Sequence, residues 1–225
     1  MIINDFNKIK LALEESELLI FDFDGVLADS VEVKTRAFSL LYKSYGKKVV
    51  EKVVKHHKNN GGMSRYEKIS YYHKKFLKQR IEAKEVTELA NCFSKLVKEK
   101  VIASSEISGA NNFLKFYCNG KKKCTINSAT PEKEVQEIIR ARCMNIFFLN
   151  ILGSPSTKVD NLNSLLRIHS LEADKALFFG DAKSDLQAAQ EVGVKFIGVG
   201  SGILEILSRQ KGGYYHINDF SDFVD

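Results

Sequence analysis

The sequence predicts an α/β fold in which helices cover a parallel sheet, with an all-helical segment inserted after the first strand. Two observations lead to this prediction. From Ile107 onward, short apolar runs alternate with amphipathic helical stretches, which is typical of a parallel sheet flanked by helices. Between the first apolar run and Ile107, apolar residues recur at helical spacing. We therefore expect a three-layer α/β/α core and a separate helical domain.

The first strand is predicted at 18–21, because LLIF has the length and the β-favouring residues of a buried parallel strand. Residues 31–105 are expected to be helical, with a loop at NNGGMSR, residues 59–65. Strands are then expected at 122–127, 146–152, 175–181 and 195–200, and helices at 131–143, 158–170 and 184–193. This order indicates a discontinuous Rossmann-like core, residues 1–30 and 106–225, and a helical cap domain, residues 31–105.

Two aspartates, Asp22 and Asp24, follow the first strand directly in LLIFDFDGVLADS. Ligands of open α/β sheets bind at the carboxyl ends of the strands, which is where this pair is predicted to lie. Two carboxylates that face one space repel each other, at a cost on the order of several kcal/mol, unless a cation or a proton compensates. The pair is thus either part of a metal site or an ordinary strand end that caps the next helix.

Polar residues also follow the next two predicted strands. The segment NSATP, residues 127–131, places Pro131 in the first turn of a helix, whose free N–H groups and neighbouring hydroxyls suit a phosphate. Taken alone, an ordinary Ser/Thr helix cap is the simpler interpretation of this segment. Lys158 opens the following helix, a position at which a surface lysine is common.

The run ALFFGDAKSD repeats the pattern of the first strand end. An apolar run again ends in an acid, Asp181, and Asp185 follows four residues later. If a helix begins within this turn, the two carboxylates lie near one another. Together with the first pair they would form an all-oxygen site suited to Mg²⁺.

The formal net charge of +6 is unevenly distributed. Residues 31–105 contain 18 Lys and Arg against 7 Asp and Glu, a balance of +11, which leaves −5 for the remainder. The sequence contains no recognised nucleic-acid motif with base-stacking aromatic residues, so a small anionic substrate or a solvated helical face explains this charge with fewer assumptions. We therefore expect no nucleic-acid partner.

No sequence window approaches the roughly 20 apolar residues of a membrane span, and the first residues lack the apolar core of a signal peptide. We therefore expect a cytoplasmic protein without a membrane partner. The sequence leaves the oligomeric state open, and a monomer is the simplest expectation. The four cysteines show no metal-ligand spacing and are expected to be reduced, mostly buried thiols. His56 and His57, beside the NNGG loop, are interpreted as solvated residues at a helix end.

In this order, DFDGVLADS, NSATP, Lys158 and GDAKSD resemble the four motifs of the haloacid dehalogenase superfamily. The helical insert is similar to the cap of its phosphoglycolate phosphatase and β-phosphoglucomutase branch. The resemblance spans nearly the whole chain. It implies an enzyme, a Mg²⁺-dependent phosphoric monoester hydrolase, that acts on a small phosphorylated metabolite, such as a sugar phosphate, through an aspartyl-phosphate intermediate.

The resemblance also implies roles for the acidic residues. Asp22 would be the nucleophile that attacks phosphorus. Asp24 would protonate the leaving alcohol and then activate water, and its backbone carbonyl would bind Mg²⁺. Asp181 and Asp185 would complete the metal site with Asp22 and Asp24.

Substrate-binding roles follow in the same way. Ser128, with the backbone N–H groups beside it at Ala129, would bind the phosphoryl group, and Lys158 would neutralise its charge. The segment GGMSRYEK resembles the cap loop of β-phosphoglucomutase, in which an arginine binds the non-reacting phosphate of the sugar. Arg65 and Lys68 are therefore candidates for binding a second anionic group.

Two alternatives stay open. A phosphomutase of the β-phosphoglucomutase type would carry a histidine after the first motif that helps gate phosphoryl transfer, and this chain has Lys34 there. A non-catalytic regulatory or nucleic-acid-binding protein on the same fold would be expected to have lost Asp22, Asp24 or Asp181, and all three are present. Asp24 also argues against carbon–halogen and carbon–phosphorus cleavage, because the relatives that catalyse those reactions lack an aspartate at this position.

Overall fold

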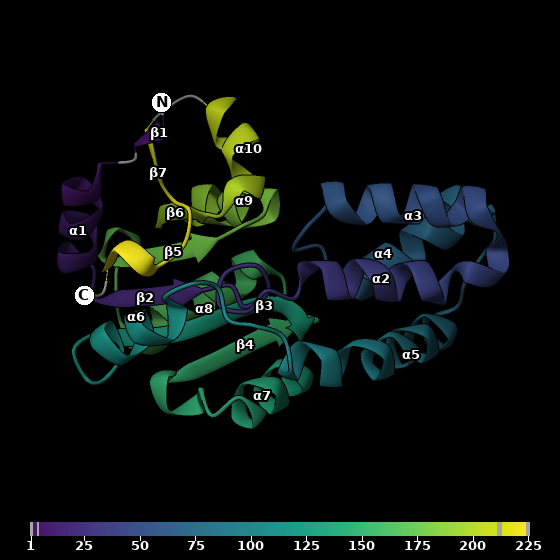
Figure 1. The fold of residues 1–225 in the computed structure, drawn as a ribbon, viewed down its shortest axis with the longest axis horizontal. Coiled ribbons are helices and arrows are strands. Elements are labelled where there is room, and N and C mark those ends of the chain that lie inside the picture. Colours follow the sequence, from purple (N-terminus) through teal and green to yellow (C-terminus); the bar gives the residue numbers. More distant parts are fainter. Residues whose placement is uncertain (1, 4, 211–212, 224–225) are drawn as a thin grey trace.

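The computed structural model describes residues 2–3, 5–210 and 213–223, which form a parallel seven-stranded sheet with helices on both faces (Figure 1). The strand order is β1-β7-β6-β5-β2-β3-β4, and each pairing is parallel. The strands are β1 (Ile2–Ile3), β2 (Leu18–Phe21), β3 (Lys123–Pro131), β4 (Asn150–Ser154), β5 (Ala176–Gly180), β6 (Lys195–Val199) and β7 (Tyr214–Ile217). The predicted α/β fold is confirmed.

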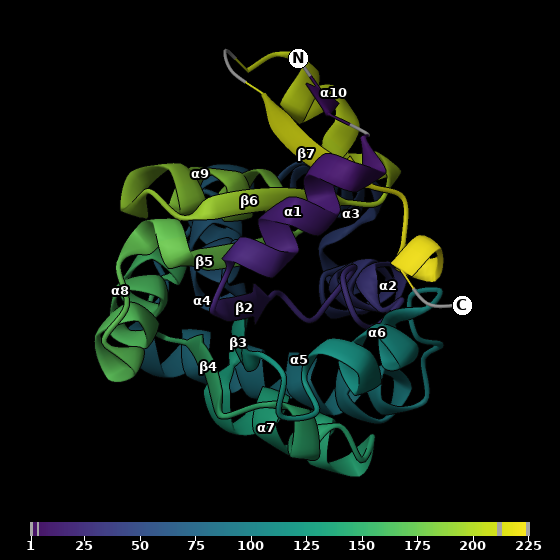
Figure 2. The ribbon, with the colours of Figure 1, turned by 90° about the vertical axis from the view of Figure 1, so that its left-hand side faces the viewer.

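The central strand β2 is buried on both of its faces. Leu19 and Phe21 belong to one apolar cluster, and Leu18 and Ile20 belong to the other, because successive side chains of a strand point to opposite sides. The first face is covered by α1 (Phe6–Glu15), α6 (Ala110–Tyr117) and α7 (Glu132–Ala141), and the second by α8 (Lys158–His169), α9 (Lys183–Val192) and α10 (Leu204–Ser208) (Figure 2).

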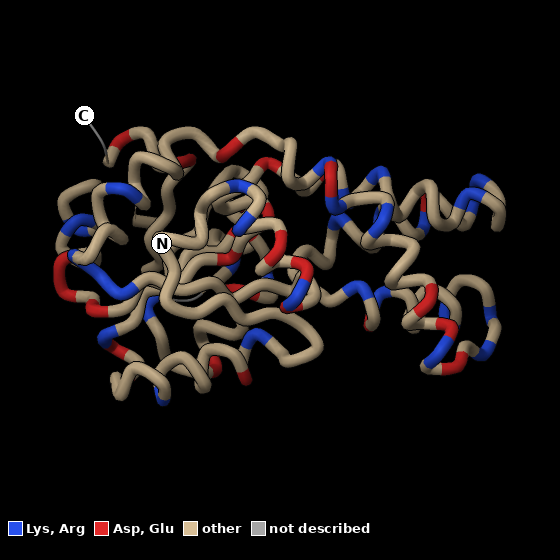
Figure 3. Tube along the Cα trace, turned by 90° about the horizontal axis from the view of Figure 1, so that it is seen from below, with Lys and Arg blue, Asp and Glu red and all other residues tan. Residues whose placement is uncertain are grey.

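Four helices extend from the carboxyl ends of the strands, at the right of Figure 1. They are α2 (Val31–Leu41), α3 (Lys47–Asn59), α4 (Arg65–Tyr72) and α5 (Ala83–Ile102). Phe38 on α2 packs against α5 and α4. The centroid of its ring lies 4.3 Å from that of Phe93 and 5.7 Å from that of Tyr72. Lys and Arg recur along the chain of these helices (Figure 3). We propose that these helices form the cap domain, residues 31–105.

Several element boundaries differ from those predicted. Strand β3 continues through NSATP, so Pro131 is the N-cap of α7 instead of a residue of its first turn. The register of β3 with β4 shifts between Asn127 and Pro131, where the chain leaves regular pairing. The strand predicted at 146–152 begins at Asn150, because 145–147 form a short 3₁₀ helix. The elements β1, α1, α6, α10 and β7 were not predicted.

The prediction that the cysteines are reduced, mostly buried thiols was wrong. Cys118 and Cys124 form a disulfide between the end of α6 and the start of β3. The intervening chain turns back at Gly120, whose φ of +81° is accessible to glycine, and no spacing rule anticipates this. Cys92 and Cys143 are free but exposed. Within the described residues, no helix is both long enough and apolar enough to cross a membrane.

Candidate active site

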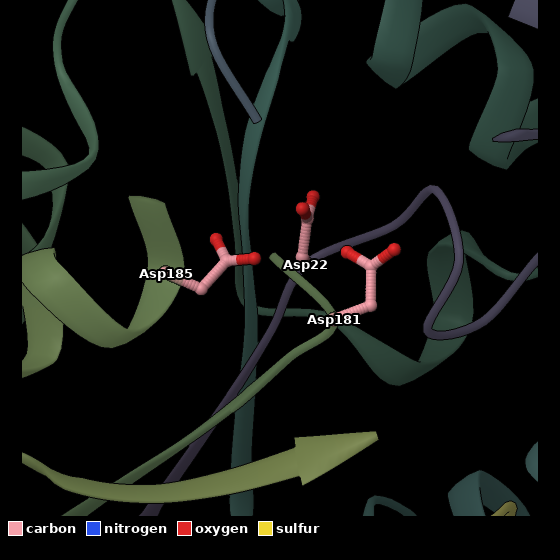
Figure 4. A group of neighbouring side chains, drawn as sticks. All are labelled: Asp22, Asp181 and Asp185. Atoms are coloured by element: carbon pink, nitrogen blue, oxygen red, sulfur yellow. The ribbon is translucent and has the colours of Figure 1, made fainter. Parts of the chain in front are cut away.

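Three aspartates meet at the carboxyl end of the sheet, where β2 and β5 are neighbours. Asp22 follows β2 and Asp181 follows β5, and the pairing of Phe21 with Phe179 places both acids at the same edge. Asp185 lies in the first turn of α9. Oxygen atoms of the three carboxylates lie within 4.8 Å of one another, with Asp185 and Asp181 on either side of Asp22 (Figure 4). This all-oxygen donor set fits Mg²⁺.

Burial and mutual repulsion make it unfavourable for these carboxyl groups to be ionised together without a cation. Burial, followed by the charges of Asp185 and Asp22, raises the pKa of Asp181 well above its ordinary range. Burial also raises the pKa of Asp185 to about 6, against the opposing charge of Lys158 and with a contribution from Asp22. A divalent cation would remove this repulsion, because it favours the ionised form of each carboxyl group.

The loop that follows Asp24 passes directly against Asp181. Gly25 has a φ of +82°, and a Cβ atom at this position would lie 2.1 Å from Asp181 Oδ2. A side chain would therefore both strain the backbone and displace the carboxylate. The glycine of DFDGV is required by this close approach.

Lys158 is buried at the start of α8, in contrast to the surface lysine that its position in the sequence suggested. Its Nζ lies 2.6 Å from Asp22 Oδ2 and also forms an ion pair with Asp185. Its backbone carbonyl accepts a hydrogen bond of 2.9 Å from Asn127 Nδ2, which fixes this helix end to β3. Burial alone would lower the pKa of Lys158, but Asp185 and Asp22 outweigh burial and raise it, so the lysine remains an ammonium.

Asp24 has a separate set of partners. Its carboxylate accepts hydrogen bonds from Ser30 Oγ at 2.6 Å and Thr130 Oγ1 at 3.0 Å, and it forms an ion pair with Lys34. Lys34 Nζ also donates to Thr130 Oγ1 at 2.7 Å. Burial would raise the pKa of Asp24, but the charge and hydrogen bond of Lys34 and the two hydroxyl donors lower it. Neither Lys34 nor Thr130 was predicted as a site residue, although Lys34 occupies the position of the mutase histidine and Thr130 belongs to the NSATP segment.

The NSATP segment contributes to the site unevenly. Ala129 and Thr130 line a cavity in front of the aspartates, whereas Ser128 is not among the lining residues and is fully buried. Ser128 Oγ accepts a hydrogen bond of 3.2 Å from the backbone N–H of Thr130. The contact of Ser128 with a phosphoryl group stays a prediction.

The cavity has a volume of about 220 Å³ and lies between the sheet edge and the helical insert. Asp22, Asp24 and Asp181 line it from the core, and Arg65 and Lys68 line it from the insert. A small ligand in this space would therefore contact carboxylates on one side and cations on the other.

Arg65 reaches the cavity, but its guanidinium is already engaged. It donates to both carboxylate oxygens of Glu134 on α7, at 2.8 and 2.6 Å, and to Ser94 Oγ at 2.6 Å. The side chains of Arg65 and Glu134 are 4% and 8% exposed, so the pair is buried. The pair thus connects α4 of the insert to α7 of the core, and a substrate anion would have to compete with Glu134 for Arg65. The contact of Arg65 with a substrate stays a prediction.

Lys68 and His57 form a buried pair on the insert side of the cavity. Lys68 Nζ lies 2.9 Å from His57 Nδ1, and both residues line the cavity. Burial, followed by the charge of Lys68, lowers the pKa of His57 to about 2, so this histidine is neutral. The interpretation of His57 as a solvated residue was wrong, because α3 turns its ring toward Phe38, 4.8 Å away between centroids. His56 is half-buried and stacks on Tyr71.

Comparison with known proteins identifies the family of the chain. The sequence profile of the haloacid dehalogenase-like hydrolases matches residues 19–199. The phosphorylated carbohydrates phosphatase of Thermotoga maritima is 28% identical over 191 residues, which are 80% of this chain and 83% of that protein.

Solved structures share the fold. A haloacid dehalogenase-like family hydrolase from Streptococcus pneumoniae superposes with a TM-score of 0.67 at 19% identity, over 91% of this chain and 95% of the other. CbbY from Rhodobacter sphaeroides, crystallised in complex with xylulose 1,5-bisphosphate, superposes with a TM-score of 0.70 at 16% identity, over 92% and 96% of the two chains.

Proposed function

The chain belongs to the haloacid dehalogenase-like hydrolase family, in its phosphatase branch, and we propose that it hydrolyses a small phosphorylated metabolite, such as a sugar phosphate, with the help of Mg²⁺. The observation that carries this proposal is the position of Asp22 on the wall of the cavity, beside Lys158 and two further aspartates. A carboxylate nucleophile, a fixed ammonium and a set of oxygen ligands are the groups that phosphoryl transfer through an aspartyl-phosphate requires.

Asp22 is the proposed nucleophile, and Lys158 the residue that holds it. The ammonium of Lys158 orients the Asp22 carboxylate and would neutralise charge on an incoming phosphoryl group. Ser128 and the backbone N–H of Ala129 are proposed to bind that group as well. Mg²⁺ bound by Asp22, Asp181, Asp185 and the Asp24 carbonyl would shield the phosphate from the charge of Asp22.

Asp24 is the proposed general acid and base. With Lys34, Ser30 and Thr130 around it, Asp24 is ionised, which is the form that activates the hydrolytic water. Protonation of the leaving alcohol needs the neutral form, so Lys34 must weaken its contact with Asp24 during that step. This requirement makes Lys34 a positioning residue for the proton transfer.

The sugar-phosphate substrate is supported by relatives. The Thermotoga maritima protein is named for phosphorylated carbohydrates, and CbbY was crystallised with a sugar bisphosphate. A phosphomutase remains the second candidate. The Asp24–Lys34 ion pair supports the phosphatase, because a lysine here stands where the mutase resemblance calls for a histidine.

Phosphate release from a panel of sugar phosphates, phosphoglycolate and nucleoside monophosphates, with and without Mg²⁺, tests the proposal. We expect release that requires Mg²⁺ and that disappears in Asp22→Asn. Isomerised products without phosphate release would favour the mutase. A lack of both products from every compound would count against catalysis of either kind.

A further inference from the structure

We propose that a cavity at the amino ends of β2, β3 and β4 binds a small anionic thiol and presents Cys118 to it for thiol–disulfide exchange. The product is a mixed disulfide at Cys118, with Cys124 released as a thiol. This site lies away from the aspartates and does not depend on the proposed phosphatase function.

The cavity lies at the edge of the sheet opposite the aspartates. Glu17 directly precedes β2, Lys123 begins β3 and Leu149 directly precedes β4, and all three residues line the cavity. The other lining residues come from the segments 118–122 and 146–147. The volume of about 510 Å³ lies within the range of sites that hold small molecules, about 300–1,000 Å³.

The disulfide between Cys118 and Cys124 meets this cavity at one of its two sulfur-bearing residues. Cys118 lines the cavity and is 6% exposed. Cys124 is 1% exposed and is not among the lining residues. Because exchange requires access to the sulfur that is attacked, a thiol bound here would react at Cys118.

The disulfide closes a short loop, which limits its contribution to stability. Cys118 and Cys124 are six residues apart, in the segment CNGKKKC. A cross-link stabilises a fold mainly by restricting the unfolded chain, and this effect grows with the length of the closed loop. Both cysteines also belong to the apolar cluster on one face of the sheet, where reduced cysteines pack well. We therefore expect the fold to tolerate the open form.

Three consecutive lysines give the cavity its positive charge. Lys121, Lys122 and Lys123 line it together with a single acid, Glu17. In the described ranges of the chain, neither Lys121 nor Lys123 forms an ion pair. Two ammonium groups are thus available to carboxylates of a ligand, and they would attract an anionic thiol in preference to a neutral one.

Lys122 has a different task, because it fixes the loop that carries Cys118. Its Nζ donates to the backbone carbonyls of Glu14 and Ser16, at 2.7 and 2.6 Å. Its backbone N–H donates to the carbonyl of Tyr117 at 2.9 Å. The loop is therefore held at the end of α1 and α6, and the position of Cys118 beside the cavity is defined.

Apolar side chains surround the same cavity. Ile146 and Leu149 are 76% and 63% exposed, the highest values among the large hydrophobic residues of the described chain. Both line the cavity beside Phe147. Exposed apolar side chains that gather at a polar rim indicate a binding surface. A small peptide-like thiol with terminal carboxylates would cover this surface while the lysines hold its charges.

The thiol itself is the only co-reactant that the exchange requires. The ligand thiol releases its proton to solvent, and its thiolate attacks Sγ of Cys118. The bond between the two protein sulfurs breaks, its electron pair leaves with Sγ of Cys124, and that thiolate takes up a proton. The ligand sulfur is oxidised to the mixed disulfide and Cys124 is reduced. Nearby ammonium groups favour the thiolate form of both sulfurs.

Exchange with glutathione, an anionic peptide thiol, tests the proposal against 2-mercaptoethanol, a neutral one. The background is Cys92→Ser/Cys143→Ser, because these two free cysteines are exposed and would react on their own. The reaction is quenched in acid, and peptide mass spectrometry identifies the modified residue. We expect glutathione on Cys118, a free thiol at Cys124, and a rate that saturates with glutathione but rises linearly with 2-mercaptoethanol.

Two lysine variants separate charge at the cavity from charge elsewhere. Lys121→Met/Lys123→Met should lower the rate with glutathione about 3- to 10-fold, because two partly exposed ion pairs are lost, and should leave the rate with 2-mercaptoethanol unchanged. The charge-matched control is Lys84→Met/Lys95→Met, which removes two exposed lysines of α5 and should change neither rate.

The oxidised peptide CNGKKKC is the control for the cavity, because it keeps the cysteines and lysines alone. It should give mixed disulfides at both cysteines, without saturation. Modification of Cys124 in the protein, a linear rate with both thiols, or an equal loss of both rates in Lys121→Met/Lys123→Met would overturn the proposal.

Thermal unfolding of the reduced protein distinguishes an exchange site from a structural cross-link. We expect the reduced background variant to stay folded and to unfold cooperatively at a modestly lower temperature. Reduced protein that is unfolded at 25 °C would assign the disulfide a structural role and overturn the proposal. Purified protein in which Cys118 and Cys124 are not joined, although no reductant was used, would overturn it as well.

Discussion

Nζ of Lys158 lies 2.6 Å from Oδ2 of Asp22, although 136 residues separate them in the sequence. The contact forms because α8 begins at the same sheet edge at which β2 ends, and Asn127 fixes the start of α8 to the neighbouring strand. Lys158 also pairs with Asp185, so one ammonium compensates two buried carboxylates. Both the stability of the site and its proposed chemistry depend on this lysine.

Replacement of Lys158 by methionine should reduce activity and stability together. We expect kcat to fall about 10²- to 10³-fold, as for removal of one preorganised group that stabilises developing charge. Without metal, the free energy of unfolding should fall by about 3–5 kcal/mol, because buried carboxylates lose their counter-charge. Urea unfolding with and without Mg²⁺ measures this loss, which Mg²⁺ should reduce. The control is Lys175→Met at an exposed position, and equal stability of the two variants would contradict the account.

The cluster of aspartates should make the metal-free protein less stable as pH rises. In the folded state the pKa of Asp185 is about 6, above its ordinary value of 3.8, and that of Asp181 is also raised. The folded protein therefore binds more protons than the unfolded chain between these values. The stability that the proton on Asp185 contributes to the folded protein is fully present below about pH 3.8. It is lost as pH rises through about 6.

Thermal unfolding of the wild type and of Asp181→Asn, each measured from pH 4 to 7 in a chelator, isolates this effect. The difference in unfolding temperature should change with pH in favour of Asp181→Asn, and Mg²⁺ should diminish the change. A difference that is constant across this range would show that Asp181 carries no raised pKa.

Removal of the Lys34 charge should raise the pKa of Asp24. The ion pair with Lys34 opposes the effect of burial, so in Lys34→Gln burial acts with less opposition. At low pH the rate falls because Asp24 becomes protonated and can no longer activate water. In Lys34→Gln this acidic limb of the pH dependence of kcat should therefore move to higher pH. Lys52→Gln, which changes an exposed lysine on α3, should leave the profile unchanged. A Lys34→Gln profile that matches the wild type would contradict this role.

The ion pair between Arg65 and Glu134 should couple the insert to the core. A double-mutant cycle with Arg65→Met and Glu134→Gln should give a strong coupling energy in urea unfolding, because each single change leaves a buried charge or amide without its partner. Lys98 and Glu137 join α5 to α7 in an exposed ion pair and provide the comparison. Their coupling should be much smaller, since solvent screens exposed charges. Equal coupling in the two cycles would argue against a connecting role for Arg65.

The fold and the acidic centre could be predicted because their signals are local. Strand β2 and the residues Asp22 and Asp24 are adjacent in the sequence, and the same holds for β5 and Asp181. Parallel neighbours bring their carboxyl ends together without further information. The prediction of the acidic cluster therefore required only that both strands belong to one sheet.

The polar partners of the site were harder to predict, because tertiary packing selects them. Lys34 lies ten residues after Asp24 and looks like a surface lysine of an amphipathic helix until α2 is placed over the cavity. The partners Glu134 of Arg65 and His57 of Lys68 lie 69 and 11 residues away in the sequence. A motif predicts which residue types are needed, whereas packing determines which of them remain free.

Identification of a covalent phosphate on Asp22 tests the central claim most directly. Wild-type protein mixed with Mg²⁺ and its best substrate from the panel is quenched in acid within one turnover, reduced with borohydride and analysed by peptide mass spectrometry. The account predicts that residue 22 is recovered as homoserine, the reduction product of an aspartyl-phosphate, and that substrate-free protein retains aspartate there. Unmodified Asp22 during active phosphate release, or modification at another residue, would contradict the account.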